Sequence, residues 1–324
     1  MKTFFSKLLL FILLLSLVLM GLEKYYDYYF TKNLDACNKP LWVLKQKNKH
    51  FDFAAIGSSR VFNMLDIKTI EKATQLKGIN IAASGSGYAE NYLLLKQFTK
   101  SNSIKTLIVQ VDLYSLDAKN AFGYPFHDYL YLNKLNESEV DSIYRDNVKP
   151  SKYYMWKYIP FSKYMEFSNF FSLYKVLKGG YECNESFLDT TNGSFLVNGS
   201  EAEAKEVKTD RNNVFKKRFI EQKDYNYLLK IVQYAKSKNI NLIFYTAPEY
   251  AQSFALQGNR NVIFDSISNL AKQHNIAYYN FDVASVALCH ELTYFKDNTH
   301  LNKQGSLLFS QQFGDSLKTR LHAQ

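Results

Sequence analysis

From residue 51 onward, short apolar runs alternate with amphipathic stretches, and this alternation constrains the fold more than any other feature of the chain. The run from Ile104 to Val111 is largely apolar, as is typical of a parallel strand covered on both faces. Strands that alternate with helices predict an α/β domain in which a parallel sheet lies between two helical layers. The predicted strands are 51–57, 78–83, 104–111, 240–246 and 276–281, and the predicted helices are 66–76, 89–99, 225–238, 262–274 and 302–317. Because such domains bind ligands at the carboxyl ends of their strands, we look for site residues there.

The N-terminus predicts a membrane segment. Two lysines precede an apolar run from Leu8 to Leu22, and a count from Phe4 gives a stretch long enough to cross a bilayer. Aromatic residues typical of a membrane interface follow directly: Tyr25, Tyr26, Tyr28, Tyr29 and Phe30. No small-residue cleavage site follows the run. We therefore expect an uncleaved signal-anchor at 1–30 that contacts lipid through residues 4–22; a cleaved signal peptide and a buried core helix are the alternatives.

By the positive-inside rule, the short lysine-bearing end stays in the cytoplasm and the remaining chain is exported. We therefore expect a single-pass protein of the cell membrane with an extracytoplasmic domain. Residues 31–50 would link the anchor to that domain. The formal charge of +10 favours either solubility or anionic envelope partners. A nucleic-acid partner is not expected, because export removes it.

A stretch at about 115–215 interrupts the strand–helix alternation. Its centre, from Tyr153 to Tyr174, is dense in Tyr, Phe and Trp. Two interpretations stay open for this aromatic insertion. It forms either a small helical subdomain with its own core, or a lid or contact surface for a membrane or partner.

Two short segments carry the candidate chemistry. Ser59 follows the first predicted strand in the sequence Gly-Ser-Ser-Arg, where helix N-terminal amides can stabilise an oxyanion. Asp297 and His300 precede the last helix, at a spacing that lets the carboxylate orient the imidazole while the ring's other nitrogen accepts a proton from serine. Each segment alone is more often a turn or a cap. Together, at strand ends of the expected fold, they indicate a nucleophile, a base and an orienting acid.

These residues resemble the blocks of the SGNH/GDSL hydrolase superfamily. Gly57-Ser58-Ser59 matches the first block with Ser59 as nucleophile, and Gly85 matches the oxyanion-hole glycine of the second. Asp297 and His300 match the Asp-x-x-His block. The resemblance implies an SGNH fold over 51–320, that is, a flavodoxin-like three-layer α/β/α sandwich, with the amides of Ser59 and Gly85 as oxyanion donors. Within the superfamily the chain resembles the exported, membrane-anchored branch that includes the D-alanyl-lipoteichoic acid transfer protein and polysaccharide O-acetylation proteins.

The chain departs from the family pattern in two places. Ser58 replaces the Asp of the first block, which is not the triad acid. The third block, Gly-x-Asn-Asp, is missing, and Tyr114 stands near its Asn. One oxyanion donor would then be absent, at a cost of roughly 10²–10³ in rate.

Other candidates carry weaker signals. Arg60 would bind an anionic acyl carrier or phosphopolymer, or is a plain surface charge, and Tyr114 is a second candidate for substrate contact. His127 and Asp128 lie in the insertion and more often belong to a surface loop. Cys289 and His290 are adjacent and should point apart, unlike a cysteine-protease pair. No zinc motif or phosphate-binding glycine loop is present, so neither a metal nor an organic cofactor is expected.

The sequence thus predicts an exported serine esterase or O-acyltransferase that acts on acyl esters of an envelope glycan or a similar acceptor. A membrane-bound O-acyltransferase is its candidate protein partner. The alternative is a weakly active or inactive SGNH scaffold that binds an envelope polymer or assists such a partner. The distance between the Ser59 hydroxyl and the His300 ring discriminates between these functions.

Overall fold

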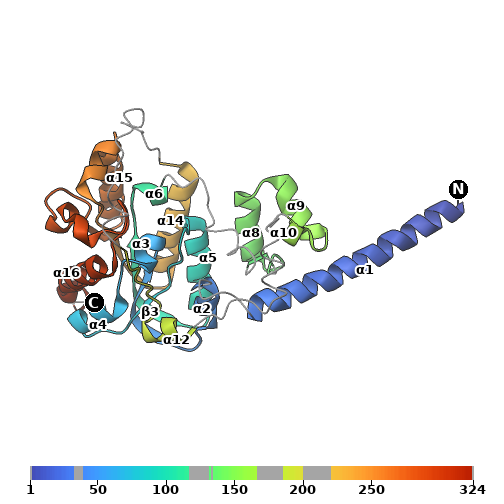
Figure 1. Ribbon diagram of the computed structural model, residues 1–324, viewed down its shortest axis with the longest axis horizontal. Coiled ribbons are helices and arrows are strands. Elements are labelled where there is room, and N and C mark those ends of the chain that lie inside the picture. The colour runs from blue at the N-terminus through green and yellow to red at the C-terminus, as the bar shows by residue number, and fades with distance from the viewer. Residues whose placement is uncertain are drawn as a thin grey trace. The chain divides into compact units, whose positions relative to one another are not determined.

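The computed structural model describes residues 2–32, 39–116, 131–132, 134–165, 185–199 and 220–322. The chain divides into two compact units (Figure 1). One contains Met1–Leu41 and Tyr124–Asn184, and the other contains Trp42–Gly123 and Glu185–Gln324. Each unit is described separately below.

The second unit is built on a parallel sheet of five strands in the order β2-β1-β3-β4-β5. The strands are β1 (His50–Ile56), β2 (Gly78–Asn80), β3 (Ser103–Gln110), β4 (Asn241–Thr246) and β5 (Ala277–Asn280). This is the strand order of flavodoxin-like folds, and it confirms the predicted fold class. Strands β1, β3 and β4 are largely buried, as expected for apolar runs that are covered on both faces.

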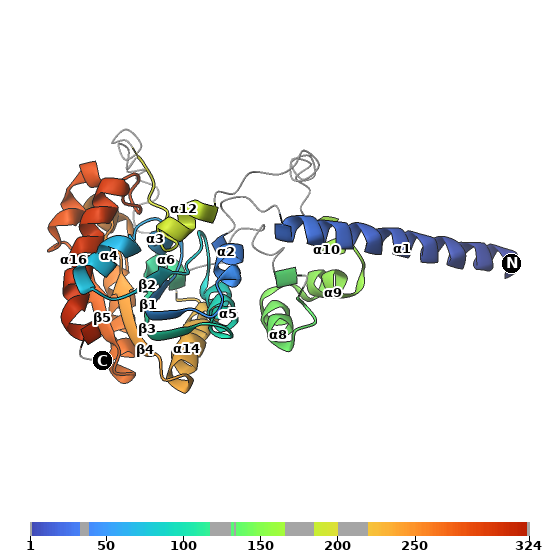
Figure 2. The same cartoon turned by 90° about the horizontal axis from the view of Figure 1, so that it is seen from below.

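Helices cover both faces of the sheet (Figure 2). On one face, α4 (Ile67–Thr74) packs against the C-terminal helix α16 (Lys303–His322). A Cβ at Gly314 would lie 2.8 Å from the Cβ of Ala73, so glycine allows these two helices to approach closely. On the other face, α5 (Tyr88–Thr99) packs against α14 (Gln222–Ser237). The strands and helices expected from the periodicity are thus all present, with ends within a few residues of the predicted ones.

Short elements complete the sheet unit. The helix α2 (Lys39–Lys45) lies in the stretch expected as a linker, and it belongs to this unit from Trp42 onward. The other short elements are α3 (Ser59–Phe62), α6 (Leu113–Leu116), α12 (Glu185–Thr190), α15 (Arg260–Gln273) and the 3-10 helices η1 (Ala251–Leu256), η2 (Ala287–His290) and η3 (Leu292–Tyr294). Residues 185–199 fall in the expected aromatic insertion but belong to the sheet unit. Asn192 accepts a hydrogen bond from the Asn80 backbone, and the ring of Phe195 stacks on Phe62.

The first unit is helical where it is described. It contains α1 (Lys2–Lys32), α8 (Ser138–Asn147), α9 (Pro150–Tyr158) and α10 (Ser162–Met165). In α9 and α10, Tyr153, Trp156 and Tyr164 are buried, whereas Tyr154 and Tyr158 are exposed. The α8–α10 part of the insertion therefore buries some of its aromatic side chains and presents others to solvent.

In the part of the chain that the structure describes, one helix is long and apolar enough to cross a membrane. It covers Lys2–Tyr28 with a mean hydropathy of 2.5, and its most apolar window has no buried part. The length and hydropathy of this helix agree with the membrane segment predicted at the N-terminus. The alternative of a buried core helix does not fit, because the helix is exposed.

Candidate active site

The turn after β1 is held rigidly by the neighbouring strand. The Ser58 amide and hydroxyl both donate to Gln110 Oε1 at the end of β3, at 2.9 and 3.0 Å. A Cβ at Gly57 would lie 2.4 Å from Val61 Cγ2 and 2.5 Å from Gln110 Oε1, so only glycine fits this close approach. Ser58 also caps the short helix α3 through its side chain. The result is a fixed, half-buried position for Ser59 at the start of that helix.

A second loop orients His300. Asp297 Oδ1 accepts hydrogen bonds from the backbone amides of Thr299 and His300, both at 2.9 Å. The imidazole Nδ1 lies 2.9 and 3.0 Å from the two Asp297 carboxylate oxygens. The loop is secured to α16 because Asn302 Oδ1 accepts from the Gly305 amide at 3.0 Å. The carboxylate therefore fixes both the loop backbone and the plane of the ring.

The structure brings the two segments together. Ser59 Oγ lies 2.8 Å from His300 Nε2, although 241 residues separate them in sequence. With Asp297 on Nδ1, the neutral ring holds its proton there, so Nε2 is free to accept the serine proton. The three side chains form a continuous hydrogen-bonded chain of the kind that activates a serine nucleophile.

The electrostatics of Asp297 suit an orienting role. Burial raises the pKa of this carboxyl, but the hydrogen bonds from His300 and Thr299 outweigh burial and hold the pKa well below its usual range. Asp297 therefore remains a carboxylate throughout the pH range in which histidine titrates, and it can stabilise an imidazolium as that forms.

The expected oxyanion glycine lies in the loop after β2. Gly85 is exposed and has a φ of +72°, a left-handed conformation that favours glycine. Asn80 ties this loop to the nucleophile helix, because its side chain donates to Val61 O at 2.9 Å and accepts from the Ala82 amide at 3.0 Å. That Gly85 and Ser59 supply oxyanion donors stays a prediction.

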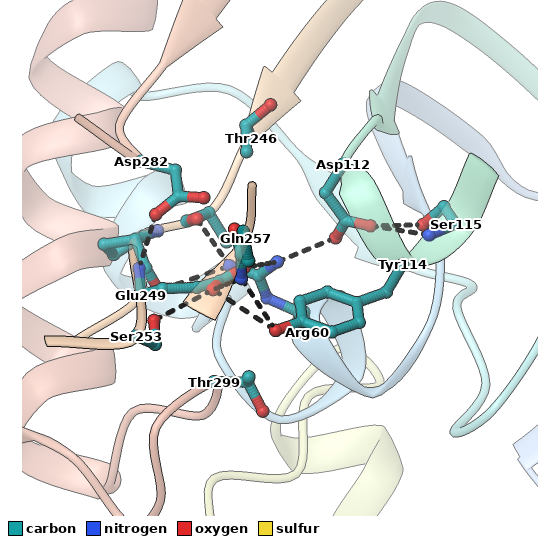
Figure 3. A network of polar contacts seen from close by, with 12 residues as sticks. Arg60, Asp112, Tyr114, Ser115, Thr246, Glu249, Ser253, Gln257, Asp282 and Thr299 are labelled. Atoms are coloured by element: carbon teal, nitrogen blue, oxygen red, sulfur yellow. Dashed lines mark hydrogen bonds and ion pairs between the residues drawn. The ribbon is translucent and has the colours of Figure 1, made fainter. Parts of the chain in front are cut away.

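Arg60, the residue after Ser59, is buried rather than exposed, with 3% of its side chain accessible. Its Nη1 lies 2.9 Å from Asp112 Oδ2 and 3.0 Å from Glu249 Oε1, and both carboxylates are fully buried (Figure 3). Its Nη2 donates to the backbone carbonyls of Ala247 and Pro248. Neither the substrate-binding role nor the surface position expected for Arg60 fits this burial. The guanidinium instead joins the start of α3 to the loops that follow β3 and β4.

Tyr114 belongs to the same network. Its hydroxyl donates to Glu249 Oε2 at 3.4 Å and accepts from Gln257 Nε2 at 3.1 Å, and its ring centroid lies 5.8 Å from the Arg60 guanidinium carbon (Figure 3). The Tyr114 hydroxyl therefore helps to hold the Glu249 carboxylate in place. The substrate contact expected for Tyr114 has no support in these bonds.

A third carboxyl completes this cluster. Asp282 follows β5, accepts from the Glu249 amide at 3.1 Å and pairs with Arg260 at 2.6 Å. Burial and the neighbouring Glu249 raise the pKa of Asp282 to about 7, against the opposing influence of Arg260 and Arg60. Burial raises the pKa of Asp112, but the Arg60 charge and the hydrogen bonds from Ser115 and Gln110 lower it by more. The net pKa lies below the usual range, so the Asp112 carboxyl stays ionised.

The buried ionic cluster (Arg60, Asp112, Glu249, Arg260 and Asp282) was not predicted from the sequence. The available signal was an acidic residue shortly after each of three strands.

The remaining candidates from the sequence do not add to this site. Cys289 is buried with its Sγ 3.3 Å from Phe281 O, whereas His290 Nε2 lies 2.8 Å from Ala284 O. The two side chains therefore have separate partners, as expected, and burial raises the pKa of Cys289 to about 12, which keeps the thiol protonated. Among the residues that the structure describes, no group of His, Cys, Asp and Glu could hold a metal ion. His127 and Asp128 lie outside the described residues.

Comparisons with known proteins give no family assignment. A scan against protein-family models finds no match, and a search of curated proteins finds none. Among solved structures, the chain is similar to one described as a lipolytic protein of the G-D-S-L family from Desulfitobacterium hafniense, with 11% identity, 83% of this chain and 98% of that chain covered, and a TM-score of 0.40. It is also similar to one described as an acylhydrolase from Bacteroides fragilis, with 8% identity, coverage of 86% and 89%, and a TM-score of 0.40. At these scores the likeness says nothing about activity, so a functional assignment has to come from the site.

Proposed function

We propose that this chain is a membrane-anchored, SGNH-type serine esterase or O-acyltransferase. The observation that carries the proposal is the hydrogen-bonded chain from Ser59 Oγ through the His300 ring to the Asp297 carboxylate. The parallel sheet supports it, because Ser59 follows the carboxyl end of β1, where ligands bind in such folds.

The reaction follows from this geometry. Ser59 Oγ attacks the carbonyl carbon of an acyl ester while His300 Nε2 accepts the hydroxyl proton. Asp297 stabilises the imidazolium, and the amides of Ser59 and Gly85 would hold the negative oxygen. Collapse of this intermediate expels the alcohol, which takes the proton from His300, and leaves an acyl-serine. Water then gives hydrolysis, whereas a sugar hydroxyl gives transfer. No step requires a metal or an organic cofactor.

The substrate class and location are part of the proposal. The apolar helix is compatible with an uncleaved anchor, and the positive-inside rule would put the sheet unit on the extracytoplasmic side. The substrates there would be acyl esters of an envelope glycan or a similar acceptor. A membrane-bound O-acyltransferase would supply the acyl group if the reaction is transfer.

One observation favours the second candidate function, an SGNH scaffold of low activity. Tyr114 stands near the Asn of the missing third block, and its hydroxyl is already bonded to Glu249 and Gln257. It therefore offers no evident replacement for the missing oxyanion donor. This predicts slow turnover of simple esters rather than a blocked triad, because the 2.8 Å contact between Ser59 and His300 leaves the nucleophile ready to react.

Covalent labelling tests the proposal. The full chain in detergent should react with a fluorophosphonate, and peptide mass spectrometry should place the adduct on Ser59. Ser59→Ala should abolish labelling. In Ser58→Ala the adduct should stay on residue 59 but form more slowly, because that side chain caps α3 and binds Gln110. Absence of labelling in a folded chain from pH 6 to 9 would favour the scaffold.

A further inference from the structure

The C-terminal part of α1 and the short helix α10 are joined by a buried ionic contact. Lys163 Nζ lies 2.9 Å from Glu23 Oε1 and 2.9 Å from Asp27 Oδ1, and only 4% of the lysine side chain is accessible. Glu23 Oε2 also accepts from the Phe161 amide at 2.7 Å, and the Tyr164 hydroxyl donates to Asp27. A buried cation that is shared by two carboxylates one helical turn apart is a fixed joint.

Aromatic packing reinforces this joint. The Tyr26 ring lies edge-on to Phe161 at 5.0 Å and also contacts Tyr164 at 5.1 Å between centroids. Phe161 itself has a φ of +65°, which is costly for a bulky residue and persists only where the surroundings impose it. In this conformation Phe161 contacts both Glu23 and Tyr26 of α1. The joint between α1 and α10 is therefore specific.

The joint lies immediately beyond the apolar part of α1. That part ends at Leu22, and at 1.5 Å per residue Glu23 and Asp27 lie roughly 2–8 Å farther along the helix axis. If α1 spans the bilayer, this depth corresponds to the lipid headgroups. The joint then holds α10, and α9 before it, at the membrane surface.

The exposed face of α9 has the composition of such a location. Tyr154 and Tyr158 stack at 6.2 Å with 52% and 68% exposure, and Ile159 follows with 53%. Tyrosine is favoured at the membrane interface because its ring is apolar and its hydroxyl is polar. The helix has no acidic residue and carries Lys152; its other lysine near this face, Lys157, is paired with Asp141 of α8.

We infer that Tyr154, Tyr158 and Ile159, here called the α9 patch, insert into the headgroup region of the bilayer that α1 crosses. The inference rests on the proposed anchor but not on the proposed chemistry. Its physical basis is continuity: the joint fixes the α9 patch to the helix that enters the membrane, so both contact the same lipid surface. The first unit would then be bound to the membrane at two places, which restricts rotation and tilt of the unit about the anchor.

Depth-dependent fluorescence quenching tests this inference in the full chain. The three cysteines are replaced by serine, and an NBD fluorophore is attached at Tyr158→Cys, at Asp146→Cys as an exposed control on α8, or at Leu13→Cys within α1. Each protein is reconstituted in phosphatidylcholine vesicles with a quarter phosphatidylglycerol. A lipid with a shallow doxyl group should quench position 158 at least threefold more than position 146, and a deep doxyl group should quench position 13.

Two variants add a causal test. Lys163→Gln breaks the joint and should reduce quenching at 158 to the level of 146 while position 13 is unchanged. Because Lys163 is buried and its variant can misfold, the exposed pair Tyr154→Ser and Tyr158→Ser should independently reduce shallow quenching of a label at position 159. If aqueous iodide quenches positions 158 and 146 equally while the deep doxyl lipid still quenches position 13, the inferred membrane insertion of the α9 patch is wrong but the anchor is not. Loss of quenching at position 13 overturns the anchor itself, and fluorophosphonate labelling of Ser59 in the same vesicles reports the chemistry separately.

Discussion

Arg60→Met should destabilise the sheet unit more than any exposed substitution, because it removes a cation from a buried site. The native guanidinium contacts Asp112 and Glu249 at 2.9 and 3.0 Å, and neither carboxylate is accessible to solvent. Loss of one partner of a buried ion pair costs about 3–5 kcal/mol, since the remaining charge is left uncompensated. At about 2–4 °C per kcal/mol for a domain of this size, the expected decrease in Tm is about 6–20 °C.

Thermal unfolding of the full chain in detergent, followed by circular dichroism, measures this effect. Lys105→Met is the matched control. Lys105 also pairs with an aspartate, Asp52 at 2.8 Å, but its side chain is 77% exposed, so the loss should be about 0–1 kcal/mol. Equal melting temperatures for the Arg60 and Lys105 variants would refute the assignment of Arg60 as a buried structural cation.

A second variant separates charge from packing. Arg60→Met combined with Glu249→Gln and Asp112→Asn removes the stranded charges, and stability should recover by more than half. Both this triple variant and Arg60→Met alone should label more slowly with fluorophosphonate than the unaltered chain. In both, residue 60 has lost its hydrogen bonds to Ala247 O and Pro248 O, which hold α3 beside the end of β4. Full labelling in a chain with an intact Tm would show that Arg60 does not position Ser59.

Four further predictions concern the triad, the pH response and the anchor. Ser59→Ala, His300→Ala and the double variant should lose esterase activity to a similar extent, because the pair acts as a unit; additive losses in measured kcat/KM would contradict this. Asp297→Asn should keep the fold but slow labelling by up to about 10⁴-fold, since the ring loses its orienting carboxylate, and near-normal labelling rates would exclude that role. The pKa of Asp282 is raised to about 7, so the folded state holds a proton that the unfolded state has lost. This group's contribution to stability is complete below about pH 4 and disappears as the pH rises through 7, so Asp282→Asn should reduce the decline in Tm between pH 5 and 8. The chain should remain in membranes after an alkaline carbonate wash with its N-terminus intact, and a soluble form beginning near Leu22 would show cleavage instead.

The sequence predicts the sheet well because strand and helix signals are local. The run at Ile104 to Val111 is recognisable from its own composition, and β3 occupies Ser103–Gln110. The triad segments are local as well, since Asp297 and His300 lie three residues apart and share one loop. The distance between Ser59 and His300, by contrast, depends on a contact across 241 residues, which only the assembled fold determines.

Contacts between distant segments account for the features that the sequence does not predict. Arg60 looks like an ordinary helix-start charge, and its burial depends on Glu249, 189 residues away. The joint between Glu23 and Phe161 spans 138 residues, and neither Glu23 nor Lys163 belongs to a motif. In both cases an isolated charged residue gives no sign of its partner, because pairing depends on which elements pack together.

The positions of the acids in the buried ionic cluster nevertheless follow a pattern that can be recognised in the sequence. Asp112, Glu249 and Asp282 each follow within three residues of the end of β3, β4 and β5, and these strands are consecutive in the sheet beyond β1. Because parallel strands end at the same edge, acids placed there converge. Arg60, at the start of the helix after β1, pairs with Asp112 and Glu249, and Arg260 pairs with Asp282. The same edge holds the proposed nucleophile. Ser59 and Arg60 are adjacent in α3; Ser59 is half-buried beside His300, and Arg60 is buried among the acids. We expect the buried ion pairs of Arg60 to fix the orientation of the adjacent Ser59, whose hydroxyl lies 2.8 Å from His300 Nε2.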